Sequence, residues 1–129
     1  MSKQKQPRRL AENEAQAVLR TVRTSPQKAG LVLDMIKGKK VEDALAALTF
    51  SPKKTAKLAK GVLESAIANA ENNHNLNIDN LVVSRAFADK SIVMKRWHAR
   101  GRGRGARILK PTCHMTIVVA EKQAKEGQK

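Results

Sequence analysis

The chain has 129 residues, the length of one domain, and its 26 basic and 11 acidic residues give a formal net charge of +15. Such an excess destabilises a compact state by self-repulsion and indicates an anionic partner. A single cysteine excludes an internal disulfide and a Cys-rich zinc site and fits a reducing cytosolic compartment, and no apolar run approaches the ~20 residues of a membrane span.

The first 38 residues predict a tail, a short strand and a helix. Residues 1–14 are basic with few apolar side chains, which is typical of a mobile tail, and a strand is expected over 17–23. Ser25 and Pro26 predict a helix start, because serine caps helices and proline fits their first position. Gly38 is expected to end that helix in the left-handed conformation. The apolar side chains recur at helical spacing: Ala29, Val32, Leu33 and Ile36.

Two further helices are predicted in the middle of the chain. The first covers about 41–48, with Glu42 and Asp43 in its first turn, where the helix dipole favours acids. Ser51 and Pro52 repeat the start signal, and the third helix is expected to run from there to about Asn73. Its predicted buried stripe comprises Ala59, Val62, Leu63, Ala66, Ile67 and Ala70.

The C-terminal half predicts two strands joined by a long hairpin. Residues 81–88 and 113–120 have strand composition, and the residues between them lack a helix signature. Pairing Phe87 with Met115 places the hairpin tip near Gly101 and extends the arm roughly 40 Å beyond Asp89, at ~3.3 Å per residue. The predicted organisation is one domain over 15–121, with the arm at 89–113 and a polar tail over 122–129.

The hairpin carries the strongest functional signal. Residues 90–120 contain no acid, and their basic side chains are Lys90, Lys95, Arg96, Arg100, Arg102, Arg104, Arg107 and Lys110. One interpretation is a solvated basic loop; the favoured one is an arm inserted into folded nucleic acid, which supplies the counter-charge. The Arg-Gly repeat over 100–105 favours the arm, because glycine lets the backbone approach phosphates and arginine binds them through two N–H groups.

Other basic and aromatic residues are weaker candidates for nucleic-acid contacts. Trp97 and His98 lie on the same arm, and Trp97 either stacks on a base, fills a crevice or packs across the hairpin. Lys53, Lys54 and Lys57 lie in the first two turns of the third helix, where cations oppose the helix dipole. They form either an RNA-binding stripe or an ordinary solvated face.

No catalytic or metal site is predicted. Cys113 and His114 are adjacent in a strand and therefore point to opposite faces, so they cannot act together as nucleophile and base. His74, His98 and His114 lack metal-ligand spacing, and no Gly-rich phosphate loop follows a strand. We therefore expect no enzyme activity, no cofactor and no small-molecule substrate.

Three segments in order resemble the bacterial-type large ribosomal subunit protein 22 family over about residues 20–121. They are Ser-Pro-Gln-Lys at 25–28 with Ile-Lys-Gly-Lys-Lys-Val at 36–41, then Leu-Glu-Ser-Ala-Ile-Ala-Asn-Ala-Glu-Asn-Asn at 63–73, and finally Met-Lys-Arg at 94–96 with Arg-Ile-Leu-Lys at 107–110 and His114. The resemblance implies an α+β fold of three helices packed on a small three-stranded antiparallel sheet, with a long protruding β-hairpin.

The resemblance also implies where the protein acts. The body would lie on the outside of the large subunit, and the hairpin would thread through 23S-type rRNA to the wall of the nascent-peptide exit tunnel. The residues at the tunnel would be Met94, Lys95, Arg96, Arg100, Gly101, Arg102, Gly103 and Arg104. From the body, Lys28, Lys39, Lys40, Asn69 and Asn73 would face rRNA; Arg23 and His114 complete the candidate rRNA-binding set.

The expected function is structural. The protein would be cytoplasmic and ribosome-bound, support subunit assembly, and have 23S-type rRNA, neighbouring ribosomal proteins and, at the tip, nascent peptide as partners. Two alternatives from other classes stay open: a non-ribosomal regulator that binds structured RNA, and a peripheral protein that binds anionic lipid. The Ala-rich helix faces suit packing better than insertion into a lipid interface, which makes lipid binding the weaker alternative.

Overall fold

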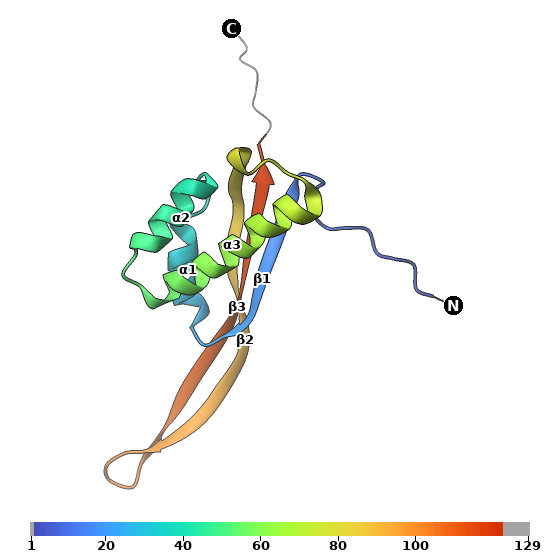
Figure 1. Cartoon of the computed structure of the whole chain (residues 1–129). Coiled ribbons are helices and arrows are strands. Elements are labelled where there is room, and N and C mark those ends of the chain that lie inside the picture. The colour runs from blue at the N-terminus through green and yellow to red at the C-terminus, as the bar shows by residue number, and fades with distance from the viewer. Residues whose placement is uncertain (1, 123–129) are drawn as a thin grey trace.

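Three strands form one antiparallel sheet in the computed structural model, which describes residues 2–122 (Figure 1). The strands are β1 (Glu14–Val22), β2 (Leu81–Ala99) and β3 (Gly105–Glu121), in the spatial order β1-β3-β2. Three helices pack on this sheet, and β2 and β3 continue beyond it as a long hairpin. The predicted α+β fold with a protruding hairpin is confirmed.

The first strand begins earlier than its own sequence indicates. Glu14 pairs with Ala120 and Ala15 with Val119, so β1 includes residues that were assigned to the tail or to the segment before the strand. These residues are extended because the edge of β3 offers them backbone hydrogen-bond partners. The partners lie at the other end of the chain, so the local sequence does not indicate them. The predicted C-terminal tail lies outside the described residues, apart from Lys122.

The first helix starts where its local signals predict. Helix α1 (Pro26–Asp34) has proline at its first position, and the Ser25 hydroxyl accepts a hydrogen bond from the Lys28 N–H at 3.3 Å. Gly38 has a φ of 76°, and its N–H donates to the Val83 carbonyl at 2.9 Å. The predicted left-handed conformation of Gly38 is confirmed, but the prediction that Gly38 ends the helix is wrong, because α1 ends at Asp34 with the right-handed Met35 as its C-cap. Gly38 lies in the turn that follows and joins it to β2.

The second serine–proline pair does not start a helix. Helix α2 (Val41–Phe50) extends to the residue before Ser51, whose N–H still bonds to the Leu48 carbonyl, so Ser51 caps the end of α2. Helix α3 (Lys54–His74) begins only after Pro52 and has Lys53 as its N-cap, with no side-chain hydrogen bond there. The prediction of a start at Ser51–Pro52 is wrong because the preceding helix uses the same serine.

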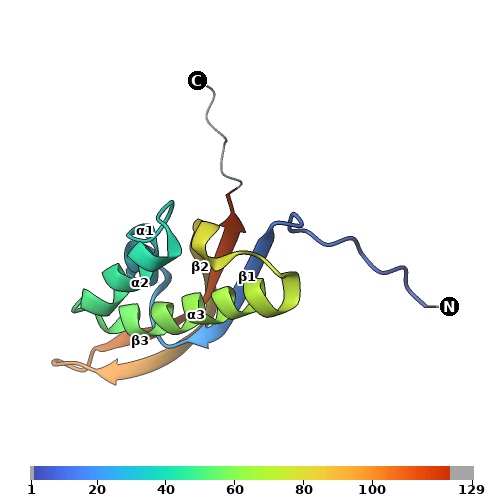
Figure 2. The same ribbon diagram turned by 45° about the horizontal axis from the view of Figure 1, so that its top comes forward.

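The core lies between the helices and one face of the sheet. Figure 2 shows α3 running across the strands, with α1 and α2 beside it. The alanine-rich stripe of α3 is buried as predicted, except that Ile67 is half-buried. Alternating residues of β3 complete this core, and all are 0% exposed: Cys113, Met115, Ile117 and Val119. A short 3-10 turn, η1 (Ile78–Asn80), leads from α3 into β2.

Candidate nucleic-acid interface

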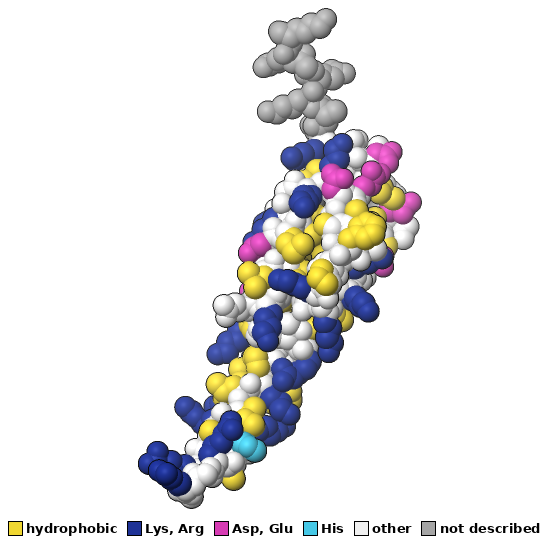
Figure 3. Space-filling view, turned by 90° about the vertical axis from the view of Figure 1, so that its left-hand side faces the viewer, with side chains coloured by type: hydrophobic (Ala, Val, Ile, Leu, Met, Phe, Trp, Pro, Cys, Tyr) yellow, Lys and Arg dark blue, Asp and Glu magenta, His cyan; other side chains and the backbone are white. Residues whose placement is uncertain are grey.

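The arm is a two-stranded ribbon with a basic turn at its tip. Strands β2 and β3 pair continuously from Val93↔Pro111 to Ala99↔Gly105, and residues 100–104 close the turn. Lys90–Ala99 spans roughly 30 Å at ~3.3 Å per residue. Figure 3 shows Lys and Arg side chains along the arm to its tip, whereas the acidic side chains lie on the body.

The register of the arm lets two strands carry many positive charges. Directly opposite residues pair basic with apolar side chains: Met94↔Lys110, Lys95↔Leu109, Arg96↔Ile108 and Trp97↔Arg107. Like charges directly opposite each other destabilise a strand pair, and this arrangement avoids them. Sequence reasoning identified the basic residues but missed Ile108 and Leu109, which are 39% and 56% exposed. Both faces of the arm therefore present alternating cations and apolar surface.

The tip is a turn with two residues of positive φ. The Arg100 N–H donates to the Arg104 carbonyl at 2.8 Å, while Arg102 and Gly103 have φ values of 60° and 66°. This conformation leaves the side chains of Arg100, Arg102 and Arg104 exposed. The predicted position of the tip near Gly101 is confirmed, and this turn presents three guanidinium groups for phosphate contacts.

Trp97 packs across the hairpin onto Gly105. A Cβ atom placed on Gly105 would overlap the indole ring of Trp97, so the ring occupies the space that a side chain at position 105 would need. Residues 97 and 105 are diagonal neighbours on one face, because Trp97 pairs with Arg107 and Ala99 with Gly105. Trp97 is nevertheless 70% exposed. Packing across the hairpin is therefore compatible with stacking on a base, because most of Trp97 stays exposed.

Two β-bulges mark the root of the arm. On β1, Leu19 pairs with Met115 and Val22 with Cys113, and the extra N–H, that of Thr21, donates to His114 Nδ1 at 2.9 Å. On β2, the shift falls between Lys90 and Val93, where Thr112 Oγ1 donates to the Ile92 carbonyl at 2.6 Å. Bulges bend and twist a strand, so this pair sets the direction in which the arm leaves the body.

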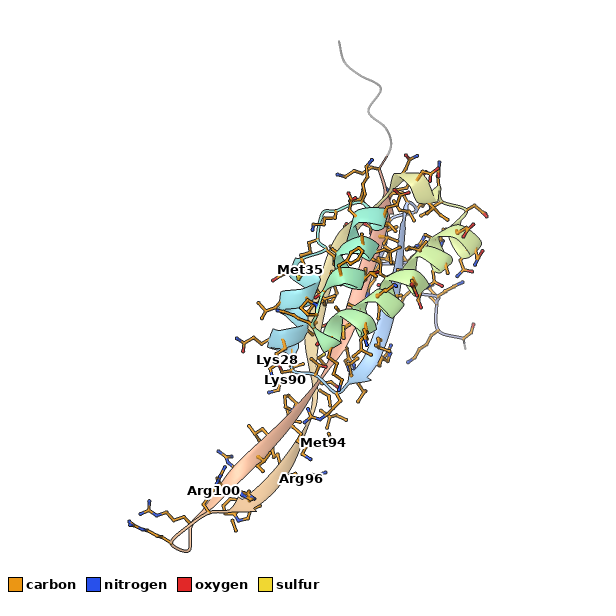
Figure 4. All side chains as sticks on the ribbon, turned by 60° about the vertical axis from the view of Figure 1, so that its left-hand side comes forward. Lys28, Met35, Lys90, Met94, Arg96 and Arg100 are labelled. Carbon is orange, nitrogen blue, oxygen red and sulfur yellow. The ribbon has the colours of Figure 1, made fainter. Side chains whose placement is uncertain are left out.

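Two of the predicted RNA-binding side chains have structural roles at this root. Arg23 Nη1 donates to the Pro111 carbonyl at 2.8 Å, and His114 is half-buried and accepts the Thr21 N–H. In Figure 4, Lys28 and Lys90 lie where the body meets the arm, and Met94, Arg96 and Arg100 follow toward the tip. Lys28 and Lys90 are exposed.

The remaining candidates occupy separate parts of the body. Lys53, Lys54 and Lys57 are exposed at the start of α3, and Lys57 lies near the middle of β1. Lys40 forms an isolated bridge with Val82, which places it at the sheet end opposite the arm, and Lys39 precedes it. Asn73 is exposed, whereas Asn69 is half-buried and donates to the Gln16 carbonyl at 3.0 Å. The structure therefore brings the arm residues together but distributes the others over the body.

Cys113 and His114 point to opposite faces of β3, as the strand alternation predicts. Cys113 is fully buried, and burial raises the pKa of its thiol, which makes it a poor nucleophile. Within residues 2–122, no three His, Cys, Asp or Glu side chains gather into a possible metal site. None of the helices in this part of the chain has the length and apolar character needed to cross a membrane.

Comparison with known proteins decides the family. The family described as Ribosomal protein L22p/L17e matches residues 17–120. The chain belongs to this family. The large ribosomal subunit protein uL22 of Rhizobium meliloti is 62% identical over 125 residues, which cover 97% of both chains. The corresponding proteins of Rhizobium etli and Brucella suis are 64% identical over 126 residues (98% of each chain) and 63% identical over 121 residues (94% of each chain).

The family assignment confirms the resemblance that three short motifs indicated. Members of this family are structural proteins of the ribosome, so the chain is a ribosomal protein and not an enzyme. The match covers both the body and the whole arm, which extends from Lys90 to Lys110. The hairpin thus lies within the part of the chain that the family matches and is no appendage of this chain alone.

Proposed function

We propose that this chain is a structural component of the large ribosomal subunit that binds 23S-type rRNA through its basic arm. The observation that carries the proposal is a paired hairpin with eight basic side chains and no acid over residues 90–120. A ribbon of this charge has no core of its own to compensate the repulsion between its side chains. Surrounding phosphates would supply the missing negative charge. The names of the relatives support the assignment to the large subunit.

The geometry of the arm suits bracing of several RNA segments at once. Both faces of the two-stranded ribbon carry cations, so RNA on either side could be neutralised by the same element. Arginine guanidinium groups bind phosphates through two parallel hydrogen bonds. The apolar side chains that lie between the basic residues would exclude water from such a contact. We infer that the arm joins rRNA segments during assembly and that its tip, residues 100–104, reaches the wall of the exit tunnel near the nascent peptide. Neighbouring ribosomal proteins would contact the body.

Sedimentation tests the proposal directly. The tagged chain, expressed in a bacterial host, is run through a sucrose gradient at about 0.5 M salt, where the Debye length of ~4–5 Å suppresses loose surface attraction. We expect the protein to sediment in stoichiometric amounts with large subunits. A variant with residues 92–110 replaced by Asn-Gly should still melt cooperatively, because the pairing of Lys90 with Cys113 lies outside the deleted segment. It should stay at the top of the gradient, because it lacks the basic arm. Wild-type protein at the top would favour a free RNA-binding regulator.

Salt dependence gives a second, quantitative test. If the eight basic side chains of the arm each meet a phosphate, the plot of log K against log salt for rRNA binding should have a slope of roughly −6 to −7. Replacing Arg100, Arg102 and Arg104 by glutamine should reduce the size of this slope by about 2 to 3. A wild-type slope near −1 or −2 would contradict the threaded arm.

A further inference from the structure

The side chain of His114 lies at the point where the arm leaves the body. Its neighbours on β3, Cys113 and Met115, are buried in the core, so His114 points to the face of the sheet opposite the helices. His114 is half-buried, and its Nδ1 accepts a hydrogen bond from the Thr21 N–H at 2.9 Å. An imidazole nitrogen that accepts carries no proton, so the neutral ring of His114 has its proton on Nε2.

This hydrogen bond holds a residue in an unfavourable conformation. The register of β1 places two residues, Arg20 and Thr21, opposite the single residue His114. Thr21 has a φ of 53°, in the left-handed region where β-bulges usually have glycine. A β-branched side chain is rare in this region, and such a conformation persists only where its surroundings hold it. The bond to His114 is one such hold, because the bulge takes Thr21 out of the ladder with β3.

A second side chain joins the same end of β1 to the arm. Arg23 Nη1 donates to the Pro111 carbonyl at 2.8 Å, and Pro111 pairs with Val93 just beyond the bulge in β2. The end of β1 is therefore bonded to β3 at two places, His114 and Pro111, on either side of the point where the arm begins. Since the arm spans roughly 30 Å, a tilt of about 10° at this root would move the tip by roughly 5 Å.

Charged groups surround His114 on both neighbouring strands. On β2, Asp89 pairs directly with His114 and Lys90 follows it; on β1, Arg20 lies opposite His114 and Arg23 lies beyond the bulge. All four are exposed, and the ion pairs found within residues 2–122 do not include His114. A protonated ring would be attracted by Asp89 and repelled by the two arginines. Protonation would therefore draw the ring away from β1 and toward β2.

We propose that His114 is a positioning residue, which holds the free arm in one direction through the Thr21 bulge, and that protonation of its imidazole releases the arm. An imidazolium has a proton on both nitrogens and offers no acceptor to the Thr21 N–H, so the bond is lost when the ring becomes charged. The use of this device rests on the proposed binding of rRNA by the arm. A direction that is fixed beforehand reduces the conformational entropy that the arm loses when it enters RNA.

The distance between the arm tip and the body tests the proposal on the full chain without RNA. Spin labels are attached to Gly101→Cys in the tip and to Thr49→Cys, an exposed position on α2, in a Cys113→Ala background. Double electron–electron resonance then gives the distribution of distances between the labels. We expect a narrow distribution at about pH 7.5 and one broader by roughly 5 Å at about pH 5.5. Histidine side chains change charge in this range, whereas carboxylates stay ionised.

Two variants of His114 separate the hydrogen bond from the charge. His114→Asn places an amide oxygen at the position of Nδ1 and cannot become protonated there, so its distribution should be narrow at both pH values. His114→Phe keeps a ring without an acceptor and should be broad at both. The matched control, His74→Asn with His98→Asn, removes the other two histidines and should respond to pH like the wild type. Far-UV circular dichroism melts show that the body of each variant is folded.

A wild-type distribution that is the same at both pH values, or a His114→Asn variant that broadens at the lower one, would overturn the proposal. Binding to rRNA provides the second readout. At pH 7.5, His114→Phe should bind about three- to tenfold more weakly than His114→Asn, with the same slope of log K against log salt, because the phosphate contacts are unchanged. Equal affinities would also overturn the positioning role. A shallow wild-type slope would refute the function proposed for the arm, and the distances would still decide whether His114 holds it.

Discussion

Replacing Gly105 by alanine should release Trp97 from the arm. The added methyl group would overlap the indole ring, and the ring can yield by rotating outward because Trp97 is already 70% exposed. About 30% of the residue is therefore covered, roughly 75 Å² if a fully exposed Trp presents ~250 Å². At ~25 cal/mol per Å², packing of Trp97 stabilises the wild-type arm by at most about 2 kcal/mol, which the variant would lose.

Tryptophan fluorescence measures the release of Trp97 without a signal from other residues. Trp97 is the only tryptophan and the chain contains no tyrosine, so the intrinsic fluorescence excited at about 295 nm reports on the arm alone. In Gly105→Ala we expect a red-shifted emission and an acrylamide quenching constant up to about 1.4-fold higher, as the exposed fraction rises from 70% toward full exposure. The far-UV circular dichroism melt of the body should not change.

The matched control is Gly101→Ala. Gly101 lies in the turn next to Gly105, has no positive φ, and has no atom within 4 Å of an added Cβ, so its substitution should leave the emission and quenching of Trp97 unchanged. If Gly105→Ala quenches like the wild type, or if both variants change equally, the indole does not rest on Gly105 and the reasoning fails.

Three further predictions concern the body. Ser25→Ala should lower the free energy of unfolding in urea by about 1 kcal/mol, and Ser51→Ala should cost clearly less, because only Ser25 caps the start of a helix; equal losses would contradict the cap assignment. Gly61→Ala, inside α3 with open space around its Cβ, should stabilise the chain by up to about 1 kcal/mol, whereas Gly38→Ala, at a φ of 76°, should destabilise it by about 1–2 kcal/mol in the same assay. The buried Cys113 thiol, with its raised pKa, should react with a disulfide reagent only as fast as the protein unfolds, and rapid stoichiometric labelling of the native protein would refute this.

Strand pairing in the hairpin shows how far sequence reasoning reaches. Leu81–Val83 pair with β3 in the register that, continued without interruption, would join Phe87 to Met115. The bulge between Val83 and Arg85 adds one residue to β2, so Phe87 pairs with Thr116 and the predicted partner is wrong by one position. The tip prediction survives because this bulge and the one between Lys90 and Val93 together move the middle of the turn by only one residue.

The sequence by itself determined the features whose causes lie within a few residues of one another. Ser25 and Pro26 start α1, Gly38 takes the left-handed conformation in the turn that follows it, and the alanine stripe selects the buried face of α3, because capping, φ preference and helical spacing are local properties. The acid-free charge of the arm is likewise visible without coordinates, and with three motifs it indicated the family.

Only the tertiary structure decided which distant residues meet. It placed β3 between β1 and β2, extended β1 back to Glu14, and assigned Ser51 to the end of α2. It also brought His114 to Thr21 and laid Trp97 on Gly105. Backbone pairing and packing between segments far apart in the chain set these contacts, and their energies depend on partners that no local pattern encodes.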